Sequence, residues 1–307
     1  MRILVVGAGS IGGYFGGRLL EAGRDVTFLV RPGRAAKLAQ TGLVLRSPVG
    51  DFTEAHPKLV VAGDTAEPFD LVLLSCKSYD LEGAIDSVAP FVGPRTAVLP
   101  LLNGMAHMDA LDAKFGPERV LGGLCLISTT LDADGHIIHM MPNHALVFGA
   151  RTGDCVTDIA AATATFSGAK FDVRASEMIL QEMWEKWVLI ATAGGLTCLM
   201  RGTIGDLVAA GGAAVATDLL GECAAVAAAN GYPPRDAAMA RMTTMFTAAG
   251  SGLTASMFRD LEQGGRIEGE QILGDLLRRG DAAASPVLRL ATVHVRTYTA
   301  RKAREAA

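Results

Sequence analysis

A glycine-rich turn near the start of the chain limits the fold more than any other feature of the sequence. An apolar, β-prone run at residues 3–6 enters the pattern GAGSIG at residues 7–12, and a helix-compatible segment follows. In such a turn the first glycine allows the bend, the second lets a pyrophosphate approach the backbone, and the third lets the helix lie close to the strand. Unpaired N–H groups at the helix start favour a diphosphate. The pattern predicts a dinucleotide site, and the alternative is a turn whose glycines only pack a helix on a sheet. The residues of the predicted site are Gly7, Gly9, Ser10, Ile11 and Gly12.

The end of the next expected strand, at residues 25–30, distinguishes between two nicotinamide cofactors. An NAD-type site usually has Asp or Glu there to hold the ribose hydroxyls, whereas this chain has Arg31, with Arg34 close by. Asp25 lies at the opposite end of the strand and cannot substitute. Because a guanidinium group matches a 2′-phosphate, the sequence predicts NADP(H), with Arg31 as a ligand. The alternative is a pair of solvated loop arginines.

Size and composition exclude several classes of function. The chain has 307 residues, half of them apolar, which is enough for two domains with separate cores. Its net charge is −4, and Lys and Arg form no block outside the short C-terminal tail, which argues against a nucleic-acid or anionic-membrane partner. No apolar run reaches the ~18 residues of a membrane span, and the N-terminus lacks the pattern of a signal peptide. The five cysteines are widely spaced and show no C-x-x-C pattern, as expected in a reducing compartment. We therefore expect a soluble cytoplasmic protein.

Three histidines lie close together in the sequence, at His136, His139 and His144. They belong to an alternating stretch that predicts strands around a Pro-Asn turn. Strand alternation would place His136 and His139 on opposite faces, so we expect no metal site there.

The first half of the chain predicts the parallel sheet of a Rossmann-type fold. Residues 44–61 suggest an inserted hairpin, and continuous apolar strands are expected at residues 70–75 and 96–102. These two strands end at Lys77 and Asn103, where the carboxyl ends of parallel strands face the ligand. Lys77 is a candidate cofactor contact, and Asn103 is a candidate contact of cofactor and substrate. The alternatives are a solvated lysine and an ordinary turn asparagine.

A change in composition near residue 175 divides the chain. Strands expected at residues 119–128, 135–149 and 171–173 would complete the first sheet, whereas Ala, Met and Leu dominate after Ser176 and predict helices. We therefore expect a doubly wound α/β domain at residues 1–174 and an all-helical substrate and catalytic domain at residues 175–307. Ser176 and Ser256 are expected to cap helices. The Ala- and Met-rich helices could form a homodimer surface or simply a core.

Lys186 is the candidate for proton transfer. It lies in a predicted helix among mostly apolar neighbours, and loss of water disfavours the charged form of an ammonium group, which suits a general acid. The alternative is a lysine whose head reaches water. Glu268 has the same ambiguity, because with Arg266 and Glu270 it could coat a surface helix.

The chain resembles the ketopantoate reductase (2-dehydropantoate 2-reductase) family over nearly its whole length. The similar features are GAGSIG at 7–12, SCKSYD at 75–80, LLNGM at 101–105, WEKW at 184–187, and Ser256 followed twelve residues later by Glu268. The resemblance implies a Rossmann domain, a helical domain, and a cleft between them that holds NADPH and a 2-oxo acid. It also implies roles for five residues: Lys186 as proton donor, Glu268 orienting Lys186 and the substrate, Asn103 near the nicotinamide, Ser256 on the substrate carboxylate, and Lys77 on the cofactor side.

One departure from the family affects the expected substrate. Family members commonly carry asparagines one and two turns beyond the lysine, where this chain has Ile190 and Gly194. We expect a less polar wall that is roomier at Gly194, so the hydroxyl of ketopantoate would gain little there. The resemblance implies NADPH-dependent reduction of 2-dehydropantoate to pantoate. The alternatives are a D-2-hydroxy acid dehydrogenase for a bulkier or more apolar 2-oxo acid and, in another class, a non-catalytic NADP(H) sensor.

Overall fold

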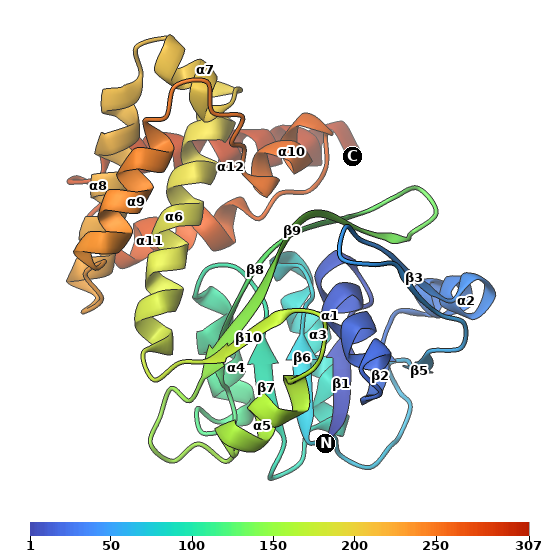
Figure 1. Cartoon of the computed structure of the whole chain (residues 1–307). Coiled ribbons are helices and arrows are strands. Elements are labelled where there is room, and N and C mark those ends of the chain that lie inside the picture. Colours follow the sequence, from blue (N-terminus) through green and yellow to red (C-terminus); the bar gives the residue numbers. More distant parts are fainter. Residues whose placement is uncertain (307) are drawn as a thin grey trace. The chain divides into compact units, whose positions relative to one another are not determined.

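Residues 1–306 are described by a computed structural model, shown in Figure 1. The chain forms two compact units. The first contains Met1–Leu102 and His107–Ile179, and the second begins at Leu180 and also takes in Asn103–Ala106. A mixed α/β unit with a parallel sheet is thus followed by a helical unit, as the sequence predicted.

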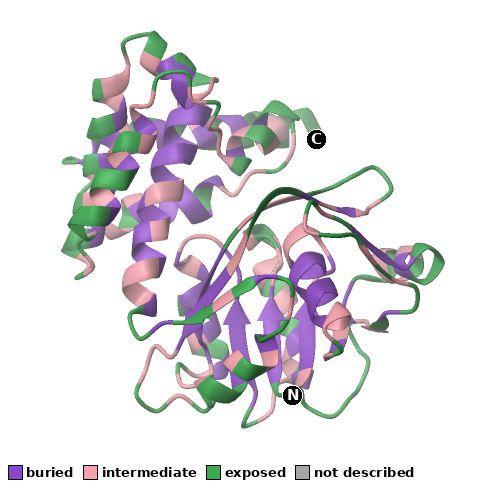
Figure 2. Cartoon of the chain, in the orientation of Figure 1, coloured by how far each residue is buried: buried purple, intermediate pink, exposed green. Residues whose placement is uncertain are grey.

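The first unit contains a five-stranded sheet in which every pair of neighbours is parallel, in the order β5-β2-β1-β6-β7. The direction in which strands are added reverses beside β1, which is where open α/β sheets bind their ligands. The central strand β1 and the strands β6 and β7 are almost entirely buried (Figure 2). Their bounds are β1 (Arg2–Val6), β2 (Asp25–Leu29), β5 (Lys58–Val60), β6 (Leu71–Leu74) and β7 (Ala97–Pro100).

Helix α1 (Ser10–Glu21) packs on strands of both sheets in the first unit, and its glycines allow this close approach. A Cβ at Gly16 would lie 2.6 Å from the ring of Phe28 in β2. Three residues earlier, a Cβ at Gly13 would lie 2.6 Å from Ile137 of the second sheet. Side chains at these positions would push the layers apart, so the glycines of α1 serve packing as well as the turn.

The other helical elements of the first unit have recognisable ends. Helix α2 begins with Pro32, a position at which the missing N–H costs no hydrogen bond. Helix α5 is capped by Asp158, whose side chain accepts from the backbone N–H groups of Ala160 and Ala161. Their bounds are α2 (Pro32–Thr41), the short turn η1 (Ser78–Asp80), α3 (Leu81–Val88), the turn η2 (Ala89–Phe91), α4 (Ala106–Phe115) and α5 (Ile159–Phe166).

A second sheet corrects the expectation that the later strands complete the first one. Its path is β10-β9-β3-β4, with β8 paired antiparallel to β9. The physical reason lies at the edge of β7, where Val98 donates to the carbonyl of Arg119 at 2.8 Å. Two residues on, Pro100 has no N–H with which to extend that ladder. The bounds are β3 (Leu43–Arg46), β4 (Phe52–Glu54), β8 (Gly122–Leu131), β9 (Ile137–Gly149) and β10 (Asp172–Ala175).

Strand β9 is one continuous strand of 13 residues, so the prediction of a Pro-Asn turn within it is wrong. The register with β8 shifts between Ile127, which faces His144, and Thr129, which faces His139. The extra residues on β9 form a bulge that contains Pro142, and a bulge is a site where proline is tolerated in a sheet.

The second unit is helical, as predicted. Ser176 Oγ accepts from the N–H of Met178 at 3.1 Å, just before α6 begins at Ile179. The N-cap predicted at Ser256 is wrong, because Ala255 is the N-cap of α10 and Ser256 is its first helical residue.

No helix within residues 1–306 is long and apolar enough to cross a membrane. The bounds are α6 (Ile179–Met200), α7 (Ile204–Ala209), α8 (Ala213–Ala229), α9 (Asp236–Phe246), α10 (Ser256–Glu262), the π-helical segment η3 (Glu270–Gly274), α11 (Asp275–Arg279) and α12 (Pro286–Ala306).

Candidate active site

The three glycines of the turn between β1 and α1 have three different environments. Gly7 has a φ of +94°, which side chains of L-residues rarely adopt. A Cβ at Gly9 would meet no atom within 4 Å, so the backbone there is open to a ligand. A Cβ at Gly12 would lie 2.2 Å from the carbonyl oxygen of Gly7 and 2.0 Å from Ser75 Oγ. The turn therefore fits a pyrophosphate at Gly9 and close packing at Gly12.

The start of helix α1 carries no negative group of its own. Gly9 is its N-cap and supplies no side-chain hydrogen bond, and the first turn contains no acidic residue. Ser10 and Ile11, which begin the helix, are both partly buried. Because the N–H groups of a first helical turn lack intrahelical acceptors, this end favours an anion.

Ser75 fixes the turn from the neighbouring strand. Its hydroxyl, directly after β6, donates to the carbonyl oxygen of Val6 at 2.8 Å and lies 3.2 Å from that of Gly7. Sequence reasoning included Ser75 only as part of the SCKSYD motif and gave it no role. Its position at the carboxyl end of a strand beside β1 is the signal that could have found it.

Arg31 and Lys77 follow β2 and β6, the two strands that flank β1. Arg31 is 76% exposed and forms an ion pair of 2.8 Å with Asp80, which closes the turn η1. Lys77 is exposed at the start of the same turn. The loops after both strands therefore carry charged side chains, and they include the carboxylate of Asp80, to which the sequence reasoning assigned no role.

Arg34 is not a solvated loop arginine. Its Nε and one terminal nitrogen donate to the carbonyl of Ala8 at 3.1 and 2.9 Å, and that terminal nitrogen also donates to Gly135 at 3.0 Å. Burial lowers the pKa of the Arg34 guanidinium from its ordinary value. Arg34 thus ties the middle of the glycine turn to the loop between β8 and β9.

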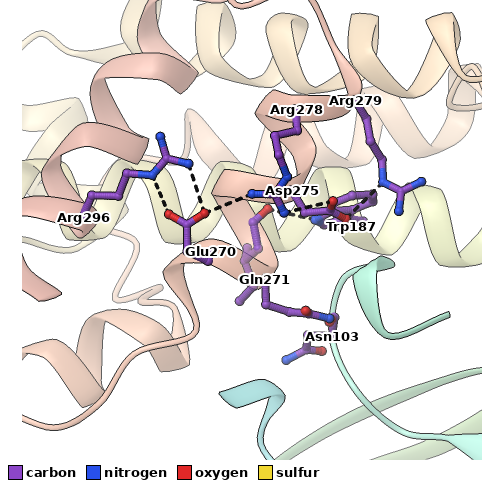
Figure 3. Close-up of polar contacts among 9 residues, drawn as sticks. Asn103, Trp187, Glu270, Gln271, Asp275, Arg278, Arg279 and Arg296 are labelled. Atoms are coloured by element: carbon purple, nitrogen blue, oxygen red, sulfur yellow. Dashed lines mark hydrogen bonds and ion pairs between the residues drawn. The ribbon is translucent and has the colours of Figure 1, made fainter. Parts of the chain in front are cut away.

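Asn103 is held through its backbone. Its carbonyl oxygen accepts a hydrogen bond of 2.8 Å from Gln271 Nε2, an almost fully buried side chain in η3 (Figure 3). Gly104 has a φ of +76°, and a Cβ there would lie 2.7 Å from the Gln271 carbonyl oxygen. The bond uses the backbone oxygen of Asn103 and not its side-chain amide. Sequence reasoning missed Gln271 because nothing in the local pattern marks it.

Lys186 is partly buried in α6, and its neighbours in the chain fix the helix on two sides. Glu185 is buried and accepts from the Nε and a terminal nitrogen of Arg235 at 2.8 and 2.7 Å. Trp187 Nε1 donates to the carbonyl of Ile272 at 2.9 Å. The Lys186 ammonium itself makes no hydrogen bond or ion pair with any residue in the described part of the chain.

Glu268 is partly buried, two residues before η3, and is not ion-paired to Lys186 in this structure. The segment η3 is held in place from α12, since Arg296 donates through two nitrogens to the carboxylate of Glu270, which also binds Arg278 (Figure 3). These hydrogen bonds lower the pKa of Glu270 from its ordinary value.

The segment η3 is π-helical and begins two residues after the candidate catalytic residue Glu268. Such segments occur frequently at functional sites.

The wall beyond Lys186 is apolar but not roomier. Ile190 is partly buried, and a Cβ at Gly194 would lie 2.8 Å from the Cε of Met257. The space that the absence of a side chain leaves at Gly194 is therefore filled by the Met257 methyl group, which corrects the expectation of extra room. Met257 follows Ser256, which is exposed at the start of α10.

The three histidines at positions 136, 139 and 144 do not converge. His136 contacts Asp132 at 2.9 Å on an exposed turn, where the ligand atoms of Asp132, Asp134 and His136 lie within 4.8 Å of one another. His139 and His144 instead stack on each other, with ring centroids 5.3 Å apart, and pack against Tyr14 of α1. The acidic turn alone does not identify a metal site.

Comparison with known proteins identifies the family. Residues 3–153 match the family described as ketopantoate reductase PanE/ApbA, and residues 178–298 match the C-terminal domain of the same family. The chain belongs to the ketopantoate reductase family. The resemblance noted in the sequence is thereby confirmed, and the chain belongs to a family of oxidoreductases.

Relatives of known sequence or structure agree with this assignment over the full length of the chain. The chain is 39% identical to the "uncharacterized oxidoreductase YkpB" of Bacillus subtilis (strain 168), over 98% of this chain and 100% of that protein. A ketopantoate reductase structure from Ralstonia eutropha JMP134 matches with a TM-score of 0.86 and 28% identity, over 98% of this chain and 99% of the other. The structure of D-mandelate dehydrogenase with NADH and anilino(oxo)acetate has the same fold, with a TM-score of 0.86 and 21% identity, over 98% of this chain and 99% of the other.

Proposed function

We propose that this ketopantoate reductase family member uses NADPH to reduce a 2-oxo acid to a 2-hydroxy acid. The observation that supports this most directly is the glycine turn, which is open at Gly9, closed at Gly12, and followed by a helix start without an acidic residue. Arg31 and Lys77 would hold the 2′-phosphate, since both follow strands next to β1.

The proposed chemistry depends on Lys186. The nicotinamide, when bound, supplies the hydride. Lys186 stabilises the negative charge that develops on the substrate carbonyl oxygen and then donates a proton to it. We propose that Glu268 orients Lys186 and the substrate. Ser256 would bind the substrate carboxylate, and the side chain of Asn103 would contact the substrate near the reacting carbonyl.

The first candidate substrate is 2-dehydropantoate, which would give pantoate and place the reaction in cytoplasmic pantothenate biosynthesis. A second candidate, a bulkier or more apolar 2-oxo acid, is favoured by the apolar character of this region. Ile190 and Gly194 stand where family members carry amides, and the Met257 methyl group fills the space beside Gly194. The hydroxyl of 2-dehydropantoate would find no partner among these side chains. In either case the product is a 2-hydroxy acid. A homodimer remains a prediction.

The test is NADPH oxidation, followed at 340 nm, against a panel of 2-oxo acids that includes 2-dehydropantoate and aryl-substituted and branched-chain members. We expect turnover with at least one of them, and a clear preference for 2-dehydropantoate would reject the second candidate. No turnover with any member, together with tight NADPH binding, would favour a non-catalytic sensor.

The Lys186→Ala variant separates the enzyme from the sensor more sharply. Loss of a general acid lowers kcat by about 10²–10⁴-fold, while the Kd for NADPH should stay within about twofold. Lys114→Ala, which removes an exposed lysine from α4, is the matched control and should leave both quantities unchanged. Equal kcat values for the two variants would exclude Lys186 as the proton donor.

A further inference from the structure

The ion pair between Arg31 and Asp80 joins the loops that follow β2 and β6. One terminal nitrogen of Arg31 lies 2.8 Å from Oδ1 of Asp80. Arg31 precedes α2, and Asp80 closes the turn η1. The residue that the sequence singled out as the 2′-phosphate ligand is thus already paired with a carboxylate.

These two charges favour different cofactors. A carboxylate near the end of the second strand accepts hydrogen bonds from the ribose hydroxyls of NAD, whereas an arginine there binds the 2′-phosphate of NADP. A phosphate would have to displace the Asp80 carboxylate from Arg31 and would then lie close to a like charge. A free 2′-hydroxyl can donate to Asp80 while Arg31 stays paired.

The second arginine, Arg34, already binds the glycine turn through two of its guanidinium nitrogens. Both the Nε and a terminal nitrogen of Arg34 donate to the carbonyl of Ala8, and the same terminal nitrogen also donates to Gly135. Turning Arg34 toward a phosphate would break the bonds that hold the middle of the glycine turn. Phosphate binding therefore depends on Arg31, with Lys77 as a further exposed cation.

We propose that Asp80 determines the cofactor selectivity of this protein by competing with the 2′-phosphate for Arg31, so that NADH binds with an affinity within about tenfold of that of NADPH. The inference rests on the dinucleotide site of the proposed function. Because the Arg31 side chain is largely exposed, its pair with Asp80 is weak enough for a phosphate to displace. The like charge of Asp80 remains beside the phosphate after the exchange.

The test measures binding and does not depend on turnover. Calorimetric titration of the full chain gives the Kd for NADPH, NADH, adenosine 2′,5′-bisphosphate and AMP, with wild type and Asp80→Asn. Removing the charge of Asp80 should tighten binding of the two 2′-phosphorylated ligands by about fivefold. NADH and AMP should change by less than twofold or bind more weakly.

Asp25→Asn is the matched control, since Asp25 forms an exposed ion pair with Lys58 at the other end of β2. This variant changes the net charge equally and should not alter the ratio of the two Kd values. Arg31→Gln is the complementary variant, and it should weaken NADPH but not NADH. Equal effects of Asp80→Asn and Asp25→Asn, or an unchanged ratio in Asp80→Asn, would overturn the role of Asp80.

The outcomes also separate this inference from the proposed function. Binding of neither dinucleotide by the wild type would overturn both. Tight binding of a dinucleotide with an NADPH:NADH ratio that does not respond to Asp80→Asn would overturn only the inference. A wild-type preference for NADPH of a hundredfold or more would also contradict it.

Discussion

The side chain of Gln271 holds the backbone carbonyl of Asn103 at 2.8 Å, although 168 residues separate them in the chain. Gly104, with its positive φ, packs directly on the backbone of Gln271. The bond therefore sets the position of a residue proposed to contact the reacting carbonyl, without itself using that residue's amide. Gln271 is a positioning residue in this arrangement.

Gln271→Met keeps the size of the side chain and removes the donor. We expect kcat to fall about 3–10-fold and the free energy of unfolding to fall by about 1 kcal/mol. The Kd for NADPH should stay within about twofold of the wild-type value. Steady-state kinetics and thermal unfolding check this, with Gln40→Ala on the exposed face of α2 as the control.

A double-mutant cycle distinguishes positioning from mere stability. If Gln271 acts through Asn103, the effect of Gln271→Met on kcat should largely disappear in an Asn103→Ala background. Independent, additive effects on kcat would show that the contact is only structural.

Two glycines of the turn should respond oppositely to alanine. A Cβ at Gly9 meets no atom within 4 Å, and its φ of −85° suits any residue, so Gly9→Ala should change the free energy of unfolding by less than about 0.5 kcal/mol. It should weaken dinucleotide binding at least about tenfold, because the methyl group stands where the pyrophosphate approaches.

Gly12→Ala places a Cβ 2.2 Å from a backbone carbonyl, which cannot move without opening the turn. We expect a loss of about 2–3 kcal/mol in unfolding free energy. Denaturant unfolding and calorimetric titration of both variants provide the comparison. Similar stability losses at the two positions would contradict these assignments.

His139 and His144 should destabilise the fold in acid. Burial lowers the pKa of both histidines below the ordinary value of 6.5, and the positive charge of Arg18 acts in the same direction. The carbonyl of Asn143 and the carboxylate of Asp172 oppose the shift for His139 and His144, respectively, without reversing it. As pH falls through about 6.5, the unfolded chain takes up protons first, so the free energy of unfolding decreases by up to about 1.4 kcal/mol per pH unit for each histidine.

His139→Gln tests this effect through the slope of stability against pH. Between pH 7 and 5 the variant should lose stability less steeply than the wild type, even if it is less stable at pH 8. His56→Gln, which replaces an exposed histidine, should keep the wild-type slope. Parallel curves for wild type and His139→Gln would reject the account.

Met257 should influence which 2-oxo acid is preferred. Met257→Ala opens the space beside Gly194, so kcat/KM for large apolar 2-oxo acids should rise about 3–10-fold relative to small ones. The loss of a buried side chain costs about 2–5 kcal/mol, so stability must be measured as well. Met242→Ala, equally buried in α9, is the control and should lower stability without changing the preference. The same change of preference in both variants would show that Met257 has no specific role.

Much of the fold was predictable from local patterns. The spacing of glycines and apolar residues in the first 12 residues already specified strand, turn and helix, because each glycine's task depends on its immediate neighbours. The helical composition of the second half was equally clear. The order of the second sheet was not predictable in this way, because it depends on Pro100 ending one ladder and on a bulge inside β9.

The sequence by itself determined the family, the α/β and helical organisation, and the identity of the candidate catalytic lysine. Only the tertiary structure decided that Arg34 binds the glycine turn, that Asp80 pairs with Arg31, and that the Met257 methyl group fills the space at Gly194. The physical reason is that these contacts join residues 26 to 63 positions apart, so a local periodicity in the sequence cannot predict them. Their partners are chosen by packing and by the hydrogen-bonding needs of buried groups, which exist only once the chain has folded.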